Sequence, residues 1–138
     1  MIKDYSQFIV KDYQYWTVSI HENQGYLGRC VIWCKREDAL DLGDATHEEM
    51  NELLSILKNL KAASSKCFHP DWFNYAFLGN ETQHLHGHFI PRYAHPRELM
   101  GVTFKDKLYG HHYKTDHSIV ISPELLQSIK GQLSEALH

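Results

Sequence analysis

The sequence has few cysteines, no long apolar run and no excess of positive charge. Its three cysteines include no CxxC pair, so neither a disulfide framework nor a four-cysteine zinc site is expected, and reduced thiols in a cytoplasm are the simplest interpretation. No stretch approaches the roughly 18 apolar residues of a membrane span, and the residues after Met1 lack the apolar core of a signal peptide. We therefore expect a cytoplasmic protein with no membrane partner.

The formal net charge of the 138 residues is -3. This balance argues against broad electrostatic capture of long nucleic acid, while a local basic site for a small anion is compatible with it. The length and the 43% hydrophobic content fit one compact domain with an ordinary core, and no repeat or linker interrupts the chain. The expected domain is residues 1–138.

Hydrophobic periodicity predicts two β-hairpins. Alternation over residues 15–20 and a nearly continuous apolar run over 29–34 predict the first hairpin, whose second strand should be well buried. Residues 73–78 and 85–92 predict the second hairpin. Its return strand carries Pro91, which weakens the strand signal because proline has no N–H to donate.

Two main helices are expected. Thr46 and Glu49 form a capping-box pattern that starts a helix over about residues 47–63. Ser122 followed by Pro123 is a cap and first-turn pattern for a second helix. The segment 94–117 shows no clear period and is expected to be mainly loop.

Three histidines alternate in the return strand of the second hairpin, at His84, His86 and His88. Successive side chains of a strand point to opposite faces, so the three imidazoles should share one surface. Imidazole titrates near neutral pH, so neighbouring copies can divide the roles of nucleophile, proton donor and charge stabiliser at a phosphorus centre. Arg92 continues this face if the strand persists through Pro91, and it is our candidate for an additional phosphate contact.

Two other interpretations of the histidines stay open. They can be histidines without chemical duty, which is the usual case for one histidine and less so for three on one face. They can also be metal ligands, since His86 and His88 on a strand can both reach one zinc ion, with a third ligand that no local spacing identifies. We predict no metal site and no cofactor.

The segment from Leu78 to Tyr93 resembles the signature of the histidine-triad (HIT) superfamily, His-φ-His-φ-His-φ-φ, because a Leu-Gly-Asn turn leads into HLHGHFIPRY. The sequence NQGYLGRCV at residues 23–31, followed by Lys35-Arg36, is similar to bacterial HIT proteins of the diadenosine tetraphosphate hydrolase-like type. The resemblance covers roughly residues 14–93. It implies an α+β, HIT-like fold with an antiparallel sheet of about five strands and two main helices, commonly as a homodimer.

The resemblance also implies an activity, because members of the family hydrolyse or transfer nucleoside monophosphoryl groups. His86 maps to the nucleophile, which attacks the α-phosphorus and forms a nucleotidyl-histidine intermediate. A backbone carbonyl near His84 would orient that ring, and His88 would stabilise charge on the phosphate or help protonate the leaving group. Dinucleoside polyphosphates are the implied substrate class.

Polar residues of the preceding turn are further candidates for contacts to the phosphate. The family places polar groups there, and this chain has Asn80, Thr82 and Gln83. An Asx turn that caps the hairpin is an equally good explanation for such residues.

Three residues depart from the family pattern. Gly87 stands where a hydrophobic residue is usual, which predicts either a bulged strand or a bulky group close to the backbone. Arg29 and Glu37 stand where many members have histidines, and for Arg29 a solvated surface position is favoured over a substrate contact. The departures support an alternative function, a non-catalytic module that binds nucleotides for sensing.

Overall fold

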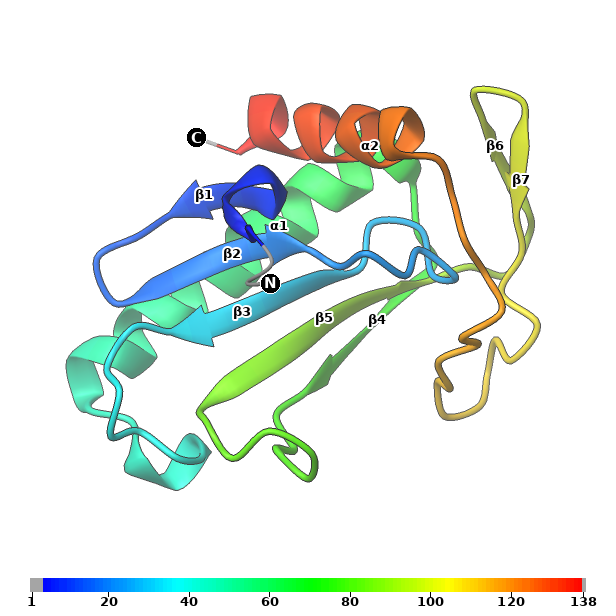
Figure 1. The fold of residues 1–138 in the computed structure, drawn as a ribbon. Helices are drawn as coiled ribbons and strands as arrows, with labels where there is room; N and C mark the ends of the chain where they lie inside the picture. Colours follow the sequence, from blue (N-terminus) through cyan, green and yellow to red (C-terminus); the bar gives the residue numbers. More distant parts are fainter. Residues whose placement is uncertain (1–3, 138) are drawn as a thin grey trace.

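A computed structural model describes residues 4–137 of the chain. A five-stranded sheet has the order β1-β2-β3-β5-β4, and every neighbouring pair is antiparallel (Figure 1). Its strands are β1 (Ile9–Asp12), β2 (Trp16–Ile20), β3 (Cys30–Cys34), β4 (Trp72–Ala76) and β5 (His86–Arg92). The helices are α1 (His47–Phe68) and α2 (Pro123–Ala136), with short 3-10 turns η1 (Ser6–Phe8) and η2 (Leu42–Asp44). The predicted α+β, HIT-like fold is confirmed.

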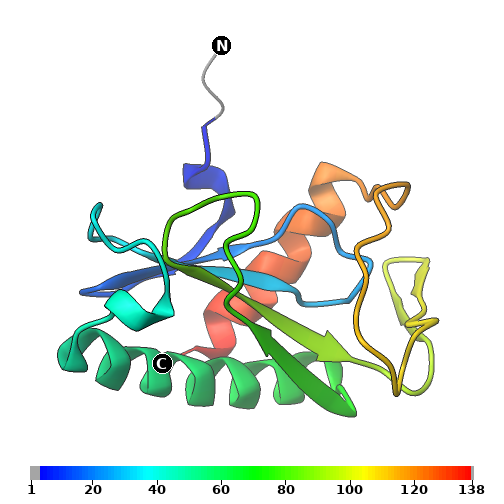
Figure 2. The ribbon, with the colours of Figure 1, turned by 90° about the horizontal axis from the view of Figure 1, so that it is seen from below.

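The sheet has two different faces. α1 covers one of them, and the loop between β4 and β5 rises on the other side (Figure 2). Strict alternation directs Trp16, Val18 and Ile20 of β2 into the core under the helices, where all three are buried. We call the opposite side, which carries Val31 and Trp33 of β3, the outer face.

Both predicted hairpins are present. In the first, the pairs run from Trp16 with Cys34 to Ile20 with Cys30. In the second, β5 continues through Pro91, which pairs with Phe73 of β4. Pro91 is tolerated there because β3 pairs with β5 only as far as Phe89, so the missing N–H lies beyond the end of that ladder.

The helices begin where their caps predict. The side chain of Thr46 accepts from the N–H of Glu49, and the carboxylate of Glu49 accepts from the N–H of Thr46. α1 is longer than predicted, since it ends at Phe68 rather than near residue 63. The next residue, His69, adopts a left-handed conformation with φ 53° and ends the helix. Among residues 4–137, no helix is both long enough and apolar enough to cross a membrane.

Two parts of the fold were missed. β1 is a short edge strand, and the segment predicted as mainly loop contains a small hairpin of β6 (Arg97–Leu99) and β7 (Val102–Phe104). Its strands have three residues each, so hydrophobic alternation has no length in which to show. The hairpin turns through Met100 and Gly101, which have φ values of 50° and 78°.

Candidate active site

The three histidines meet on the outer face beside an aromatic residue of β3. The register of β3 with β5 places Trp33 opposite His86 and Val31 opposite His88. The ring centres of His86 and His88 are 5.6 Å apart. The ring centre of Trp33 lies 4.2 Å from that of His84 and 5.5 Å from that of His86. The structure therefore brings the three imidazoles together.

The proton on the ring of His86 is fixed by a backbone carbonyl. Its Nδ1 lies 2.6 Å from the carbonyl oxygen of His84. A carbonyl can only accept, so Nδ1 carries a proton, and in the neutral ring Nε2 keeps its lone pair. No hydrogen-bond partner occupies Nε2 of His86 within residues 4–137. This is the state in which an imidazole can act as a nucleophile.

The ring of His84 is held by the neighbouring strand. Its Nε2 lies 2.6 Å from the carbonyl oxygen of Cys34, to which it donates. Its plane is stacked on Trp33 with an interplanar angle of 18°. With both its ring face and its Nε2 engaged, His84 is placed to support the backbone that orients His86.

His88 lies among cationic and neutral nitrogen groups. Its Nδ1 is 3.3 Å from Nη2 of Arg29, and its ring centre is 5.7 Å from that of His21. Burial, and then the charges of Arg29 and His86, lower the pKa of His88 to about 4. His88 is therefore neutral at physiological pH.

Arg29 is buried, so its expected solvated position is wrong. Only 3% of the residue is exposed. Its Nη1 donates to Oγ1 of Thr115 at 2.8 Å, and its guanidinium lies 5.4 Å from the ring of Tyr113. The segment that covers Arg29 has no periodic pattern, which is why the sequence did not reveal this burial.

The HIT domain family matches residues 6–95, a span that includes all three histidines. The chain belongs to the HIT family. Solved HIT structures share its fold: a histidine triad protein from Bradyrhizobium japonicum is 20% identical with a TM-score of 0.71, over 94% of this chain and 90% of that one. A zinc-bound histidine triad family protein from Mycobacterium smegmatis is 18% identical with a TM-score of 0.56, over 94% and 87% of the two chains.

A structure of a Plasmodium falciparum diadenosine triphosphate hydrolase is 14% identical, with a TM-score of 0.62 over 94% of this chain and 76% of that one. At such identities the likeness shows the fold alone. No curated protein sequence matched the chain.

The strand of the HIT motif is regular at Gly87. No register shift interrupts the pairing of β5 with β3, so the bulge does not occur. Instead, the ring of Phe77 lies 2.2 to 2.6 Å from where a Cβ of residue 87 would stand. The second alternative, a bulky group close to the backbone, is confirmed, because Phe77 fills the volume that a hydrophobic residue at this position would use.

Arg92 lies on the outer face but is fully engaged by protein groups. It is 2% exposed, and its Nε and Nη2 donate to the two carboxylate oxygens of Asp106 at 2.7 and 3.1 Å. Its Nη1 donates to Oδ1 of Asn74 and to the carbonyl of His111, both at 2.8 Å. The charge is paired, so this arrangement suits a residue that holds the covering segment on the sheet.

The three polar residues of the turn before the HIT motif are exposed, as the burial pattern of the loop shows for Asn80, Thr82 and Gln83. Within residues 4–137, none of these side chains makes a hydrogen bond, so no Asx turn forms. Their loop rises on the outer side of the sheet (Figure 2). They are free to contact a ligand there.

His21 is a further site residue, which was not predicted from the sequence. It follows β2 and continues the outer-face alternation of Thr17 and Ser19. Its Nδ1 accepts from the N–H of Asn23 at 2.9 Å, and burial followed by the charge of Arg29 lowers the pKa of His21 to about 3. The same period-two argument that grouped the triad could have found it.

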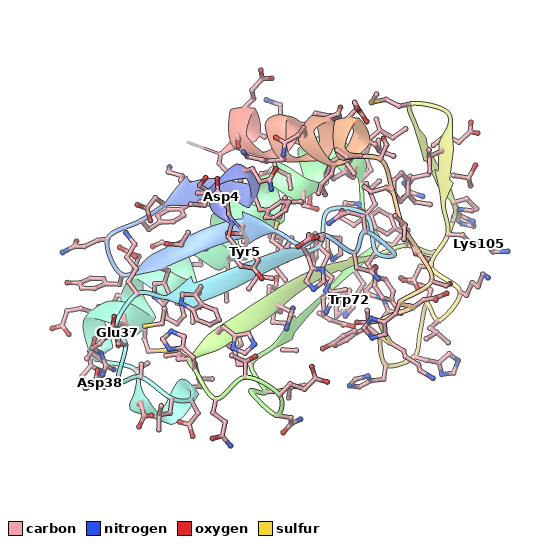
Figure 3. The ribbon with its side chains drawn as sticks, in the orientation of Figure 1. Asp4, Tyr5, Glu37, Asp38, Trp72 and Lys105 are labelled. Atoms are coloured by element: carbon pink, nitrogen blue, oxygen red, sulfur yellow. The ribbon has the colours of Figure 1, made fainter. Side chains whose placement is uncertain are left out.

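A groove of about 710 Å³ lies along the strand next to β5. It is lined by Asn74 and Ala76 of β4 and by the segment 109–113, and Ala76 pairs with His88. Glu37 lies in an exposed turn after β3, at the opposite end of the molecule from Lys105 (Figure 3).

Within residues 4–137, no group of three His, Cys, Asp or Glu side chains is arranged to hold a metal ion.

Proposed function

We propose that this HIT protein is a nucleotide hydrolase or transferase that cleaves at a nucleoside α-phosphate, with dinucleoside polyphosphates such as diadenosine tetraphosphate as its substrate class. One observation carries the proposal. The hydrogen bond from Nδ1 of His86 to the carbonyl of His84 leaves Nε2 of His86 with its lone pair and no protein partner. A nucleophile needs that lone pair, and the bond supplies it without any proton transfer.

The reaction proceeds in two displacements. Nε2 of His86 forms a bond to the α-phosphorus, and the bond from phosphorus to the leaving phosphate oxygen breaks. The positive charge that develops on the imidazole is stabilised by the carbonyl of His84 at its Nδ1–H. Water or another acceptor then attacks the same phosphorus and loses its proton to solvent, and the imidazole leaves with its original tautomer restored.

Other residues are assigned around this centre. Asn80, Thr82 and Gln83 are proposed to contact the phosphates from their exposed loop. For Arg92 we propose an indirect role in place of a phosphate contact, since Asp106 and its other partners engage its guanidinium. His88 is proposed to stabilise charge on the phosphoryl oxygens.

The nucleophile assignment is tested with a panel of dinucleoside polyphosphates, nucleoside phosphoramidates and adenylylated compounds. We expect His86→Ala to lower turnover by at least about 1000-fold, while His47→Ala, an exposed histidine at the start of α1, keeps wild-type activity. Mass spectrometry of the quenched wild-type reaction should detect a nucleotidyl group on His86.

Equal turnover by His86→Ala and wild type would overturn the assignment. Tight nucleotide binding without product and without the adduct would instead favour the alternative, a non-catalytic sensing module. The departures from the family pattern at Arg29, Glu37 and Gly87 support that alternative. Detection of the adduct excludes that alternative.

We also propose the assembly and location of the protein. The chain is proposed to form a homodimer through β4 and α1, and to be one domain in which α2 packs against α1 and β1. The free thiols of Cys30, Cys34 and Cys67 support a reducing, cytoplasmic location.

A further inference from the structure

Arg29 is a buried cation without an acidic partner. Within residues 4–137 it forms no ion pair, and its Nε is buried with no hydrogen-bond partner. Buried arginines are normally paired, because removing a charge from water is costly. The groups that Arg29 does engage are Oγ1 of Thr115, the ring of Tyr113 and Nδ1 of His88. The contact to His88 is the one that reaches the proposed site.

The direction of the contact between Arg29 and His88 follows from chemistry. A guanidinium has only N–H donors and stays charged in proteins, so Nη2 can only donate across the 3.3 Å to Nδ1. Nδ1 of His88 must then accept, and the proton of the neutral ring lies on Nε2. His86 has the opposite tautomer, with its proton on Nδ1. Two neighbouring histidines thus present a lone pair and an N–H.

We propose that Arg29 is a positioning residue of the triad, which holds His88 in the neutral tautomer that carries its proton on Nε2. The contact between Arg29 and His88 does not depend on the proposed function, but the role that it gives His88 in the reaction rests on that function. In that reaction, His88 donates a hydrogen bond from Nε2 to a non-bridging phosphoryl oxygen and keeps its proton.

This tautomer decides between two roles of His88. A neutral imidazole that gave up its Nε2 proton would become an imidazolate, which is far too basic to form at physiological pH. His88 therefore stabilises charge and does not protonate the leaving group, whose proton comes from solvent.

The titratable and charged groups around His88 are Arg29 just before β3, His86 on β5 and His21 after β2, with Tyr113 beside Arg29. Burial and the charges of Arg29 and His86 favour the neutral ring. A protonated His88 would add a second cation next to a guanidinium, without a carboxylate to compensate it. The low pKa of His88, about 4, agrees with this arrangement.

The test is histidine-selective nitrogen NMR on the nucleotide-free protein, with the His88 signals assigned by their loss in His88→Gln. In wild type we expect the proton on Nε2 and a titration midpoint near 4, against 6.5 for an ordinary histidine. Arg29→Met removes both donor and charge, so tautomers should mix and the midpoint should rise above 4, while burial of His88 still holds it below 6.5. Arg29→Gln keeps a neutral donor, so it should keep the tautomer while the midpoint rises.

A proton on Nδ1 in wild type, or an unchanged tautomer and midpoint in Arg29→Met, would overturn the proposal. If Arg29→Met does not fold, Arg29→Gln provides the test. A proton kept on Nε2 of His88 with a raised titration midpoint supports the proposal, and loss of the proton from Nε2 contradicts it. The measurement uses no nucleotide, so a protein that hydrolyses none of the panel still answers it, and failure of the proposed function is seen separately.

Kinetics on any nucleotide that wild type turns over add a second readout. We expect Arg29→Met to lower kcat by about 100-fold through the misplaced donor, and Arg29→Gln to recover most of that loss. If Arg29→Lys restores activity while Arg29→Gln is as slow as Arg29→Met, the charge itself binds phosphate and the positioning role is wrong.

Discussion

At the scale of single residues, Phe77 and Gly87 form a matched pair. A methyl group at position 87 would stand 2.2 to 2.6 Å from the ring of Phe77, inside the core side of β5. We expect Gly87→Ala to lower the free energy of unfolding by about 1 to 3 kcal/mol, because overpacking forces side chains and backbone to shift. Urea denaturation of wild type and variant measures this difference.

The control for this prediction is Gly131→Ala in α2. A Cβ there meets nothing within 4 Å, and alanine in a helix is more stable than glycine by about 1 kcal/mol, so that variant should be more stable than wild type. Replacing Phe77 by leucine should recover part of the loss in Gly87→Ala. If Gly87→Ala is as stable as wild type, the ring of Phe77 does not define this site.

Period-two alternation was enough to group the histidines, because a strand leaves no choice about which side chains share a face. The same rule placed Arg92 on the outer face. It could not show that Asp106 occupies its guanidinium or that Arg29 is covered near Thr115, since both partners come from a segment without periodicity. Contacts between residues that are distant in sequence could therefore not be predicted.

At the scale of elements, the start of α1 is stabilised by a buried carboxylate. Glu49 accepts from the N–H of Thr46 and from Nε and Nη2 of Arg36, at 2.8 to 3.1 Å. The guanidinium of Arg36 is the main reason that the pKa of Glu49 falls from 4.5 to about 2. Since the folded pKa lies below the unfolded one, this stabilisation is complete above pH 4.5 and is lost as the pH falls toward 2.

We expect Glu49→Gln to lower the free energy of unfolding at neutral pH by about 1.5 to 3 kcal/mol, because its charged hydrogen bonds are lost. The deficit should shrink as the pH falls from 4.5 to about 2, where the wild-type carboxylate becomes neutral as well. Melting temperatures across this range check it, with the exposed neighbour Glu48→Gln as control. A deficit that does not change with pH would contradict the electrostatic explanation.

Elements with length and caps were predictable, whereas short ones were not. The capping box and the apolar spacing predicted the start and the course of α1. Its end at the left-handed residue His69 could not be predicted, because no local sequence pattern marks a histidine as a left-handed cap. The hairpin of β6 and β7 has three-residue strands, and β1 is a four-residue edge strand. Pairing with neighbours, not their own pattern, makes these segments strands.

At the scale of the whole molecule, the two edges of the sheet differ. β1 is covered by α2, where Oγ of Ser134 donates to the carbonyl of Val10 at 3.1 Å. β4 has only β5 beside it within residues 4–137. An uncovered edge strand is a surface that proteins normally protect or use for pairing.

Exposed apolar side chains are found on β4 and on one stripe of α1. Tyr75 of β4 is 43% exposed, and Met50 and Leu54 of α1 are 40% and 55% exposed. Lys61, two turns further along the same stripe of α1, places its ammonium 5.7 Å from the centre of the Phe73 ring, so this end of the stripe lies next to β4. A second copy related by a two-fold axis would cover this surface with its own equivalent residues.

We therefore predict a dimer in solution, with a mass near twice 16.1 kDa in sedimentation or light-scattering measurements. Leu54→Lys should shift the protein to the monomer mass of 16.1 kDa without lowering the melting temperature of the monomer fold, because the side chain is already 55% exposed. Val120→Lys is the matched control, since Val120 is 86% exposed and lies outside this surface. A wild-type protein that remains monomeric at high concentration would show that β4 and α1 stay open, and the two-fold arrangement would then be wrong.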